Sequence, residues 1–267
     1  MASMTQISGG FLLPLYTLWQ REIVRFLRQR SRVAGALGSP LVFWLLIGSG
    51  FGNSFRPASG PISTGYLEYF FPGTILMILL FTSIFSNISV IEERREGFLL
   101  SVLVSPASRL SLALGKILGA TTLAALQGGL FACFAPLLGI RLGGLQWVVL
   151  FLLIFLISLS LTALGFAFAW KLDSIQGFHA LMNLLLVPMW LLSGALFPMS
   201  GASSWVRAIM VVNPMTYAMA ALQQGLYLGS PKPVQEFCSL PTATLITAIF
   251  GASMTLISMS LISRKQV

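Results

Sequence analysis

The sequence predicts an all-α integral membrane protein with six transmembrane helices, an N-terminal interfacial amphipathic helix, and short or re-entrant outer helices between the fifth and sixth spans. Of its 267 residues, 56% are hydrophobic and 9% are charged, whereas a soluble domain carries about 25% charged residues. Uncharged windows long enough to cross a bilayer recur along the chain. This composition excludes a soluble domain and a disordered chain. The two cysteines exclude a disulfide-stapled secreted domain.

Six windows of about 20 mostly apolar residues define the expected spans. We place them at about 33–52, 69–91, 113–139, 147–170, 174–195 and 240–262, within one membrane domain of residues 1–267. A seventh uncharged window, 208–231, contains Asn213, Pro214 and Gln223, and such groups need partners in hydrocarbon. We interpret it as an outer-surface or membrane-dipping segment, with a seventh span as the alternative.

Basic residues decide the expected orientation, because cytoplasmic loops are enriched in Lys and Arg. With six spans and a cytoplasmic N-terminus, twelve of the 16 basic residues lie on the inner side. The four on the outer side are Arg56, Arg141, Arg207 and Lys232. The net charge of +9 is therefore a topology signal and a means of binding anionic lipid, not a sign of nucleic-acid binding.

Residues 15–32 have a helical period with a basic face opposite an aromatic, apolar face. Arg21, Arg25, Arg28 and Arg32 share the basic face, and Trp19 lies on the apolar one. A helix of this kind lies in the headgroup plane of a membrane. We therefore predict an interfacial helix, and a helix that only orients the first span by its charge is the alternative.

The expected cytoplasmic segment between the second and third spans is the most informative part of the chain. It opens with a cluster of acidic and basic residues and continues as an apolar run that ends before Pro106, where a helix must stop. Ion pairs within a solvated loop are one interpretation, each worth about 0–1 kcal/mol. The apolar run, however, needs to be covered by lipid or by a partner protein, and we favour a partner. The candidate contact residues are Glu92, Glu93, Arg94, Arg95, Glu96, Gly97, Phe98, Leu99, Leu100 and Leu103.

Residues suited to catalysis or ion coupling are sparse. His179 is the only histidine and lies near the inner end of the fifth span, which is more typical of a packing residue than of a proton relay. No pair of histidines or Cys/His cluster suits a metal, and Gly115-Lys116 lacks the other residues of a phosphate-binding loop. We expect no catalytic residue, metal or cofactor in this chain, and a membrane path powered by a separate subunit. Cys133 and Cys238 both lie near the expected outer side. Two free thiols are the favoured interpretation, and a disulfide between them is the alternative.

Three stretches, in this order, carry a family resemblance. They are residues 21–32, in which Glu22 follows Arg21; residues 92–109, an acidic-Arg-Glu-Gly segment followed by a Leu-rich run and Ser-Pro; and residues 213–217, Asn-Pro-Met-Thr-Tyr. Together they resemble the membrane subunit of type-2 ATP-binding-cassette (ABC) exporters, such as the daunorubicin-resistance and nodulation-factor export permeases. One departure is Phe98, which stands where a small Thr or Ser often follows the glycine.

The resemblance implies a half-transporter of a bacterial cytoplasmic membrane that forms a homodimer and binds two ABC ATPase subunits, which in turn bind ATP and Mg. Residues 21–32 then correspond to the connecting helix, and residues 92–105 include the coupling helix. Spans one, two and five line the substrate path and the dimer seam. The outer gate includes Pro198, Asn213, Pro214 and Tyr217.

We expect export of a hydrophobic or amphipathic molecule, either a drug or a lipid-like compound, because apolar, adaptable side chains accept varied shapes. Export of a polysaccharide or lipid-linked glycan by the same family is one alternative. A non-transporting membrane assembly or scaffold protein is another, and an ion-coupled carrier is a third.

Overall fold

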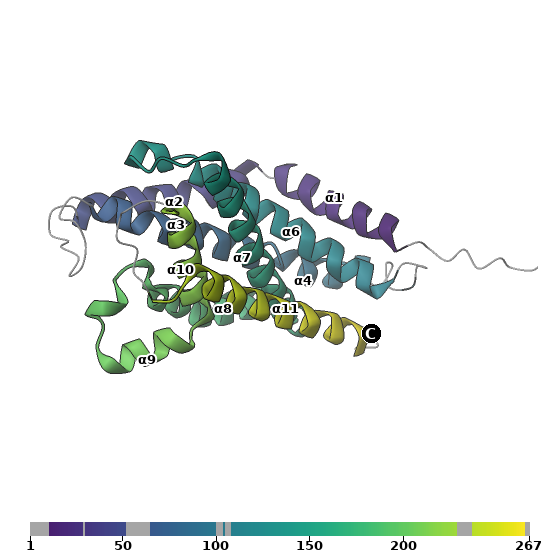
Figure 1. Ribbon diagram of the computed structural model, residues 1–267. Helices are drawn as coiled ribbons and strands as arrows, with labels where there is room; N and C mark the ends of the chain where they lie inside the picture. Colours follow the sequence, from purple (N-terminus) through teal and green to yellow (C-terminus); the bar gives the residue numbers. More distant parts are fainter. Residues whose placement is uncertain are drawn as a thin grey trace, which may run out of the picture.

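The computed structural model describes residues 11–28, 30–51, 65–99, 104, 108–228 and 237–264, and the described part consists of helices and their connections, with no strand (Figure 1). The helices before the third predicted span are α1 (Leu12–Arg28), α2 (Arg30–Phe51), α3 (Tyr66–Phe85) and α4 (Ile88–Arg95). The middle of the chain forms α6 (Arg109–Ala132), η2 (Ala135–Leu138), α7 (Gly144–Lys171) and α8 (Ile175–Trp190). The remainder forms η3 (Leu191–Ala195), η4 (Met199–Gly201), α9 (Ser204–Val212), α10 (Pro214–Leu226) and α11 (Leu240–Arg264).

Helix α3 forms the centre of the bundle, and α2, α6, α7 and α10 pack around it. Small residues allow this close packing, as is common between membrane helices. A Cβ on Gly128 of α6 would lie 2.4 Å from a methyl group of Leu79, and a Cβ on Gly165 of α7 would lie 3.0 Å from one of Ile84. The backbones of α6 and α7 therefore approach α3 closely at the turns that carry these two glycines.

The predicted class, an all-α membrane protein, is confirmed. Five helical segments are long and apolar enough to cross a membrane: Tyr66–Arg95, Arg109–Leu138, Gly144–Lys171, Ile175–Ala195 and Leu240–Ser263. They coincide with the second to sixth predicted spans. The first predicted span lies in α2, of which the shorter segment Gly38–Phe51 is the apolar part.

The window at 208–231 does not form one long helix. Helix α9 ends at Val212, and α10 begins at Pro214, because Asn213 adopts an extended backbone and proline starts the next helix. Neither helix is long enough to be a candidate span, in keeping with an outer or membrane-dipping segment.

Different helices lie at the two ends of the bundle (Figure 1). Helices α1 and α4 and the C-terminal end lie at one end, and α9 lies toward the other. Helix α1 runs beside the first turns of α6. It ends at Arg28, four residues earlier than the sequence suggests, so Arg32 belongs to α2.

Candidate functional site

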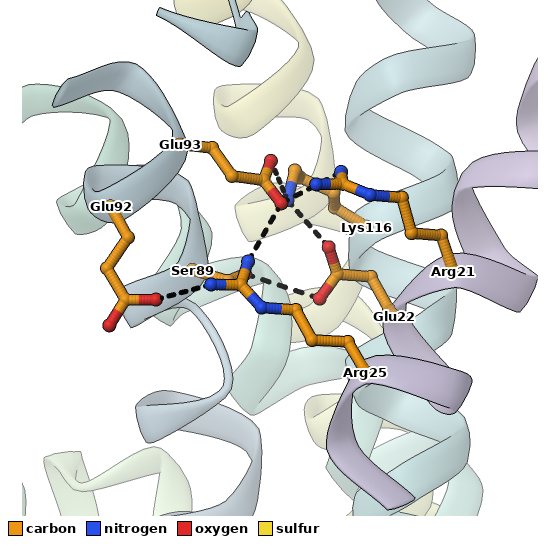
Figure 2. Close-up of polar contacts among 7 residues, drawn as sticks. All are labelled: Arg21, Glu22, Arg25, Ser89, Glu92, Glu93 and Lys116. Carbon is orange, nitrogen blue, oxygen red and sulfur yellow. Dashed lines mark hydrogen bonds and ion pairs between the residues drawn. The ribbon is translucent and has the colours of Figure 1, made fainter. Parts of the chain in front are cut away.

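A buried charge network joins α1, α4 and α6, and Glu93 of α4 lies at its centre (Figure 2). The Glu93 side chain is completely buried. Its Oε1 lies 2.9 Å from Nη1 of Arg21 and 3.0 Å from Nη1 of Arg25, and its Oε2 lies 2.7 Å from Nζ of Lys116. One carboxylate from α4 thus pairs with two cations of α1 and one of α6.

Two further carboxylates complete the network. Lys116 Nζ donates to Oε1 of Glu22 at 2.7 Å, and Ser89 Oγ donates to the other oxygen of Glu22 at 3.3 Å. Arg25 also donates to Glu92 at 2.7 Å. The network therefore balances three cations against three carboxylates. Because burying unpaired charge is costly, this balance holds α1 against α4 and α6 in one arrangement.

Local sequence explains why α1 can approach α6 so closely. Residues 115 and 119, one turn apart on α6, are both glycine. A Cβ on Gly119 would lie 2.7 Å from Cβ of Glu22, and one on Gly115 would lie 2.9 Å from Cβ of Leu18. Trp19 donates its indole N–H to Oγ1 of Thr122 at 3.1 Å on the same face. The helix predicted to lie on the membrane surface is thus anchored to α6 by a face that carries Leu18, Trp19 and Glu22.

The other residues of the predicted partner-contact segment fall into two groups. Arg94 donates to Oδ1 of Asp173 at 2.8 Å and to the carbonyl of Ala169 at 2.6 Å, and Arg95 donates to the carbonyl of Asp173 at 3.1 Å. These two arginines fasten α4 to the connection between α7 and α8. Glu96 is exposed beside them.

The chain turns after Glu96. Gly97 has a φ of 76°, a conformation that glycine adopts without strain. The guanidinium of Arg21 lies over the ring of Phe98, 3.7 Å from its centroid, and Leu99 is buried. Leu100 and Leu103 lie outside the described residues. In α1, Arg28 is exposed, and of Arg32 only the backbone is described.

The predicted outer-gate residues lie around a break in the fifth span. After α8, the π-helical turn η3 contains Gly194 at a φ of 89°. Asn213 donates its side-chain amide to the carbonyl of Met189 at 2.6 Å, and its Oδ1 caps α10 by accepting the N–H of Met215 at 3.0 Å. Tyr217 donates to the carbonyl of Val211 at 2.9 Å.

Pro214 is the first residue of α10, and Pro198 is half-buried just before η4. The structure therefore brings Asn213, Pro214 and Tyr217 together at the junction of α9 and α10. Two tyrosines of α3 also bind this region, since Tyr66 donates to the carbonyl of Leu196 at 2.9 Å and Tyr69 to that of Gly194 at 2.8 Å.

A cavity of about 660 Å³ opens between α2, α3 and α8. Phe26 of α1 and Ile88 of α4 border it at the end nearest the charge network. None of its lining residues is an Asp, Glu, Lys or Arg. Its size suits a drug-sized molecule.

A family model described as "ABC-2 type transporter" matches residues 14–227, from α1 to the residue after α10. The chain belongs to the ABC-2 type transporter family. A protein of Cyanophora paradoxa named as transport permease ycf38 is 28% identical over 218 residues, which cover 80% of this chain and 74% of that protein. Nodulation protein J of Rhizobium meliloti (strain 1021) is 24% identical over 222 residues, covering 80% of this chain and 81% of that protein.

Family membership makes this chain a multi-pass membrane component of transport, and ABC-2 permeases normally work with an ABC ATPase. Within the described residues, no group of three or more His, Cys, Asp or Glu side chains could hold a metal ion. Both cysteines are free thiols.

Lys116 is one residue of the permease whose role sequence reasoning missed. The sequence showed it only as part of a failed phosphate-binding pattern, yet it links two carboxylates that lie 94 and 23 residues away in the chain. One signal was available: Lys116 is the only charged residue of α6 after its first residue, Arg109, and a lysine inside an apolar helix needs an anionic partner. Glu68 was missed too, although it accepts a hydrogen bond from Tyr227 at 3.2 Å. Burial and the neighbouring Glu68 carboxylate raise the pKa of Tyr227, which therefore stays neutral.

Proposed function

We propose that this permease is the membrane subunit of an ATP-driven exporter that moves a hydrophobic or amphipathic molecule, a drug or a lipid-like compound, out across the bacterial cytoplasmic membrane. It acts as a homodimer with two ABC ATPase subunits, which bind ATP and Mg. The observation that carries the substrate class is the cavity between α2, α3 and α8. Because its lining has no Asp, Glu, Lys or Arg, an apolar body can enter it without stranding a buried charge.

Orientation follows from the basic residues. Helix α1 carries three arginines, and α4 ends with Arg94 and Arg95. This concentration of positive charge favours a cytoplasmic location for this end of the bundle. The C-terminal end lies on the same side. On this orientation both termini are cytoplasmic, and α9 and α10 lie near the outer surface.

The ATPase contact is proposed at the turn after α4. Arg95 and Glu96 are exposed there, and Val104, further along the same segment, has an exposed apolar side chain that a protein partner can cover. Glu93, by contrast, is buried and forms ion pairs with Arg21, Arg25 and Lys116 of the same chain. We assign it a positioning role: because it is bound to α1 and α6, a displacement of α4 by the ATPase is passed to both helices.

The test is ATPase coupling in a reconstituted complex of the full chain with its ATPase. Glu96→Lys reverses an exposed charge, and Gly97→Pro imposes a φ of about −65° where the chain has 76°. Both variants are expected to insert normally and to lose substrate-stimulated ATP hydrolysis and transport. Arg207→Glu, a charge reversal at an exposed site on the outer α9, serves as the matched control and keeps both activities.

The proposed contact is wrong if Glu96→Lys and Gly97→Pro retain full coupling. The exporter assignment as a whole fails if the gently solubilised chain never co-purifies with an ATPase in equal amount. It also fails if no added amphiphile changes the ATPase rate.

A further inference from the structure

The cavity between α2, α3 and α8 has a polar end and an apolar end. Helices α3 and α8 run in opposite directions, so Ser86, just after α3, and His179, in the first turns of α8, both lie at the end near α1 and α4. Met77 of α3 and Trp190, the last residue of α8, lie at the other end. The 11 residue-to-residue steps from His179 to Trp190 span about 16 Å of helix.

The polar end offers both a hydrogen-bond acceptor and a donor. Ser86 Oγ donates its own proton to the carbonyl of Thr82 at 2.7 Å, so what remains to it are acceptor lone pairs. The ring of Phe85 lies 5.0 Å from that of His179, centroid to centroid. Within the described chain no group hydrogen-bonds to the His179 imidazole, which in its neutral form has one N–H donor and one acceptor nitrogen.

At the opposite end of the cavity, the side chain of Trp190 has no free hydrogen-bonding group. Trp190 donates its indole N–H to the carbonyl of Gly73 at 2.9 Å, and an indole has no other donor and no acceptor. Trp190 therefore presents only its ring to the cavity, beside Phe43, Met77 and Val187. Ser86 and His179 thus offer hydrogen-bonding groups at one end, and the lining beside Trp190 at the other end is aromatic and aliphatic.

We propose that this cavity binds a hydroxyl-bearing amphiphile, with its hydroxyl between Ser86 and His179 and its apolar body extending toward Trp190. A hydroxyl fits this pair because it can donate to Ser86 Oγ and accept from the imidazole N–H. A carboxylate lacks the donor, and an alkane lacks both. This inference rests on the proposed function, since it names the substrate class and its orientation, with the head toward the cytoplasmic end.

Orientation can be measured by photo-crosslinking on the intact chain in lipid nanodiscs. Two n-dodecanol probes are used, one with a diazirine beside the hydroxyl and the other with a diazirine at the far end of the tail. The head-labelled probe is expected to modify peptides that contain Ser86 or His179, and the tail-labelled probe those that contain Met77 or Trp190. The same peptides labelled by both probes, or the reverse pattern, would overturn the proposal.

Variants at His179 test the hydrogen bond separately from the shape of the cavity. His179→Leu removes both polar atoms of the side chain. It is expected to weaken the binding of n-dodecanol by about three- to tenfold, as measured by competition with the head-labelled probe. His179→Gln keeps a donor and an acceptor and is expected to bind within about twofold of the unaltered chain. Unlabelled n-dodecane is expected to compete with the head-labelled probe equally well in the unaltered chain and in both variants. Equal competition by n-dodecanol in all three chains contradicts the proposed role of His179.

These measurements need no ATPase, so the two proposals can fail independently. A chain that shows the expected labelling but never couples to an ATPase refutes the exporter and leaves the binding site. A chain that transports amphiphiles while both probes label the same peptides refutes only the binding orientation.

Discussion

Replacing Lys116 by methionine tests whether the charge network holds α1 in place. Methionine keeps most of the length of the lysine stem and removes its charge. Glu93 retains Arg21 and Arg25 after this change, at 2.9 Å and 3.0 Å. Glu22 loses the one cation that contacts it among the described residues and keeps only the hydroxyl of Ser89. The chief consequence is thus a buried Glu22 carboxylate without a cation.

Removing one partner of a buried ion pair costs about 3–5 kcal/mol. The Lys116 side chain is 2% exposed and that of Glu22 is 9% exposed, so water screens this pair little. We therefore expect Lys116→Met to lower the free energy of unfolding by about 3–5 kcal/mol. The second change Glu22→Gln removes the stranded charge, so the double variant Lys116→Met/Glu22→Gln is expected to recover much of that loss.

The assay is unfolding by SDS in mixed micelles, followed by helical circular dichroism. Trypsin cleavage after Arg21 or Arg25 reports the release of α1 in parallel. Lys171→Met, at an exposed lysine at the end of α7, is the control and should change stability by no more than about 0.5 kcal/mol. If Lys116→Met behaves like this control, or if the double variant is less stable than the single one, the network does not anchor α1 as argued.

Three further changes have defined outcomes. Gly73→Ala places a Cβ 2.9 Å from that of Ala195 and 3.0 Å from its carbonyl oxygen, so the SDS titration should show a loss of roughly 1–3 kcal/mol; Gly201→Ala, with no atom within 4 Å of the added Cβ, should show none of this loss. Asn213→Ala removes the α10 cap and the link to α8 and should cost about 1–2 kcal/mol, and an unchanged titration would contradict the cap. Burial raises the pKa of the Cys238 thiol above its usual 9.0, so maleimide should label it more slowly than a small free thiol at neutral pH, with the rate rising as the pH is raised; equal rates at neutral pH would contradict the shift.

The spans could be predicted from the sequence because each is a local property of the chain. An uncharged apolar run implies a helix that crosses the bilayer, and no other segment is needed for that inference. The helices do not end where the expected spans end. The second span was expected to end at 91, yet the helical segment continues to Arg95 with only a short interruption after Phe85. Asn87 bridges this interruption, because its amide donates to the carbonyls of Ser83 and Thr162.

The charge network could not be predicted, because its partners are far apart in the chain. Arg25 and Glu93 are 68 residues apart, and Glu22 and Lys116 are 94 apart. Read locally, Glu92 to Glu96 form a charged loop segment, and both a solvated loop and an external partner are consistent with it. The structure divides this segment instead: Glu93 is buried within the chain, and Glu96 remains exposed. Whether a charge faces inward depends on packing that a local pattern does not contain.

The same packing changes what α1 can do at the membrane surface. The sequence pattern favours a helix whose arginines meet lipid headgroups, but Arg21 and Arg25 are paired with glutamates of α4. Leu12, Leu13 and Leu27 are instead exposed on α1. Apolar contact with lipid depends on buried area rather than on lipid charge, and paired arginines have little left to offer an anionic headgroup. We therefore expect anionic lipid to affect the position of α1 mainly through Arg28. Arg28→Gln should then remove most of the dependence of the α1 position on anionic lipid. If that dependence survives the change, the charge network opens in the membrane.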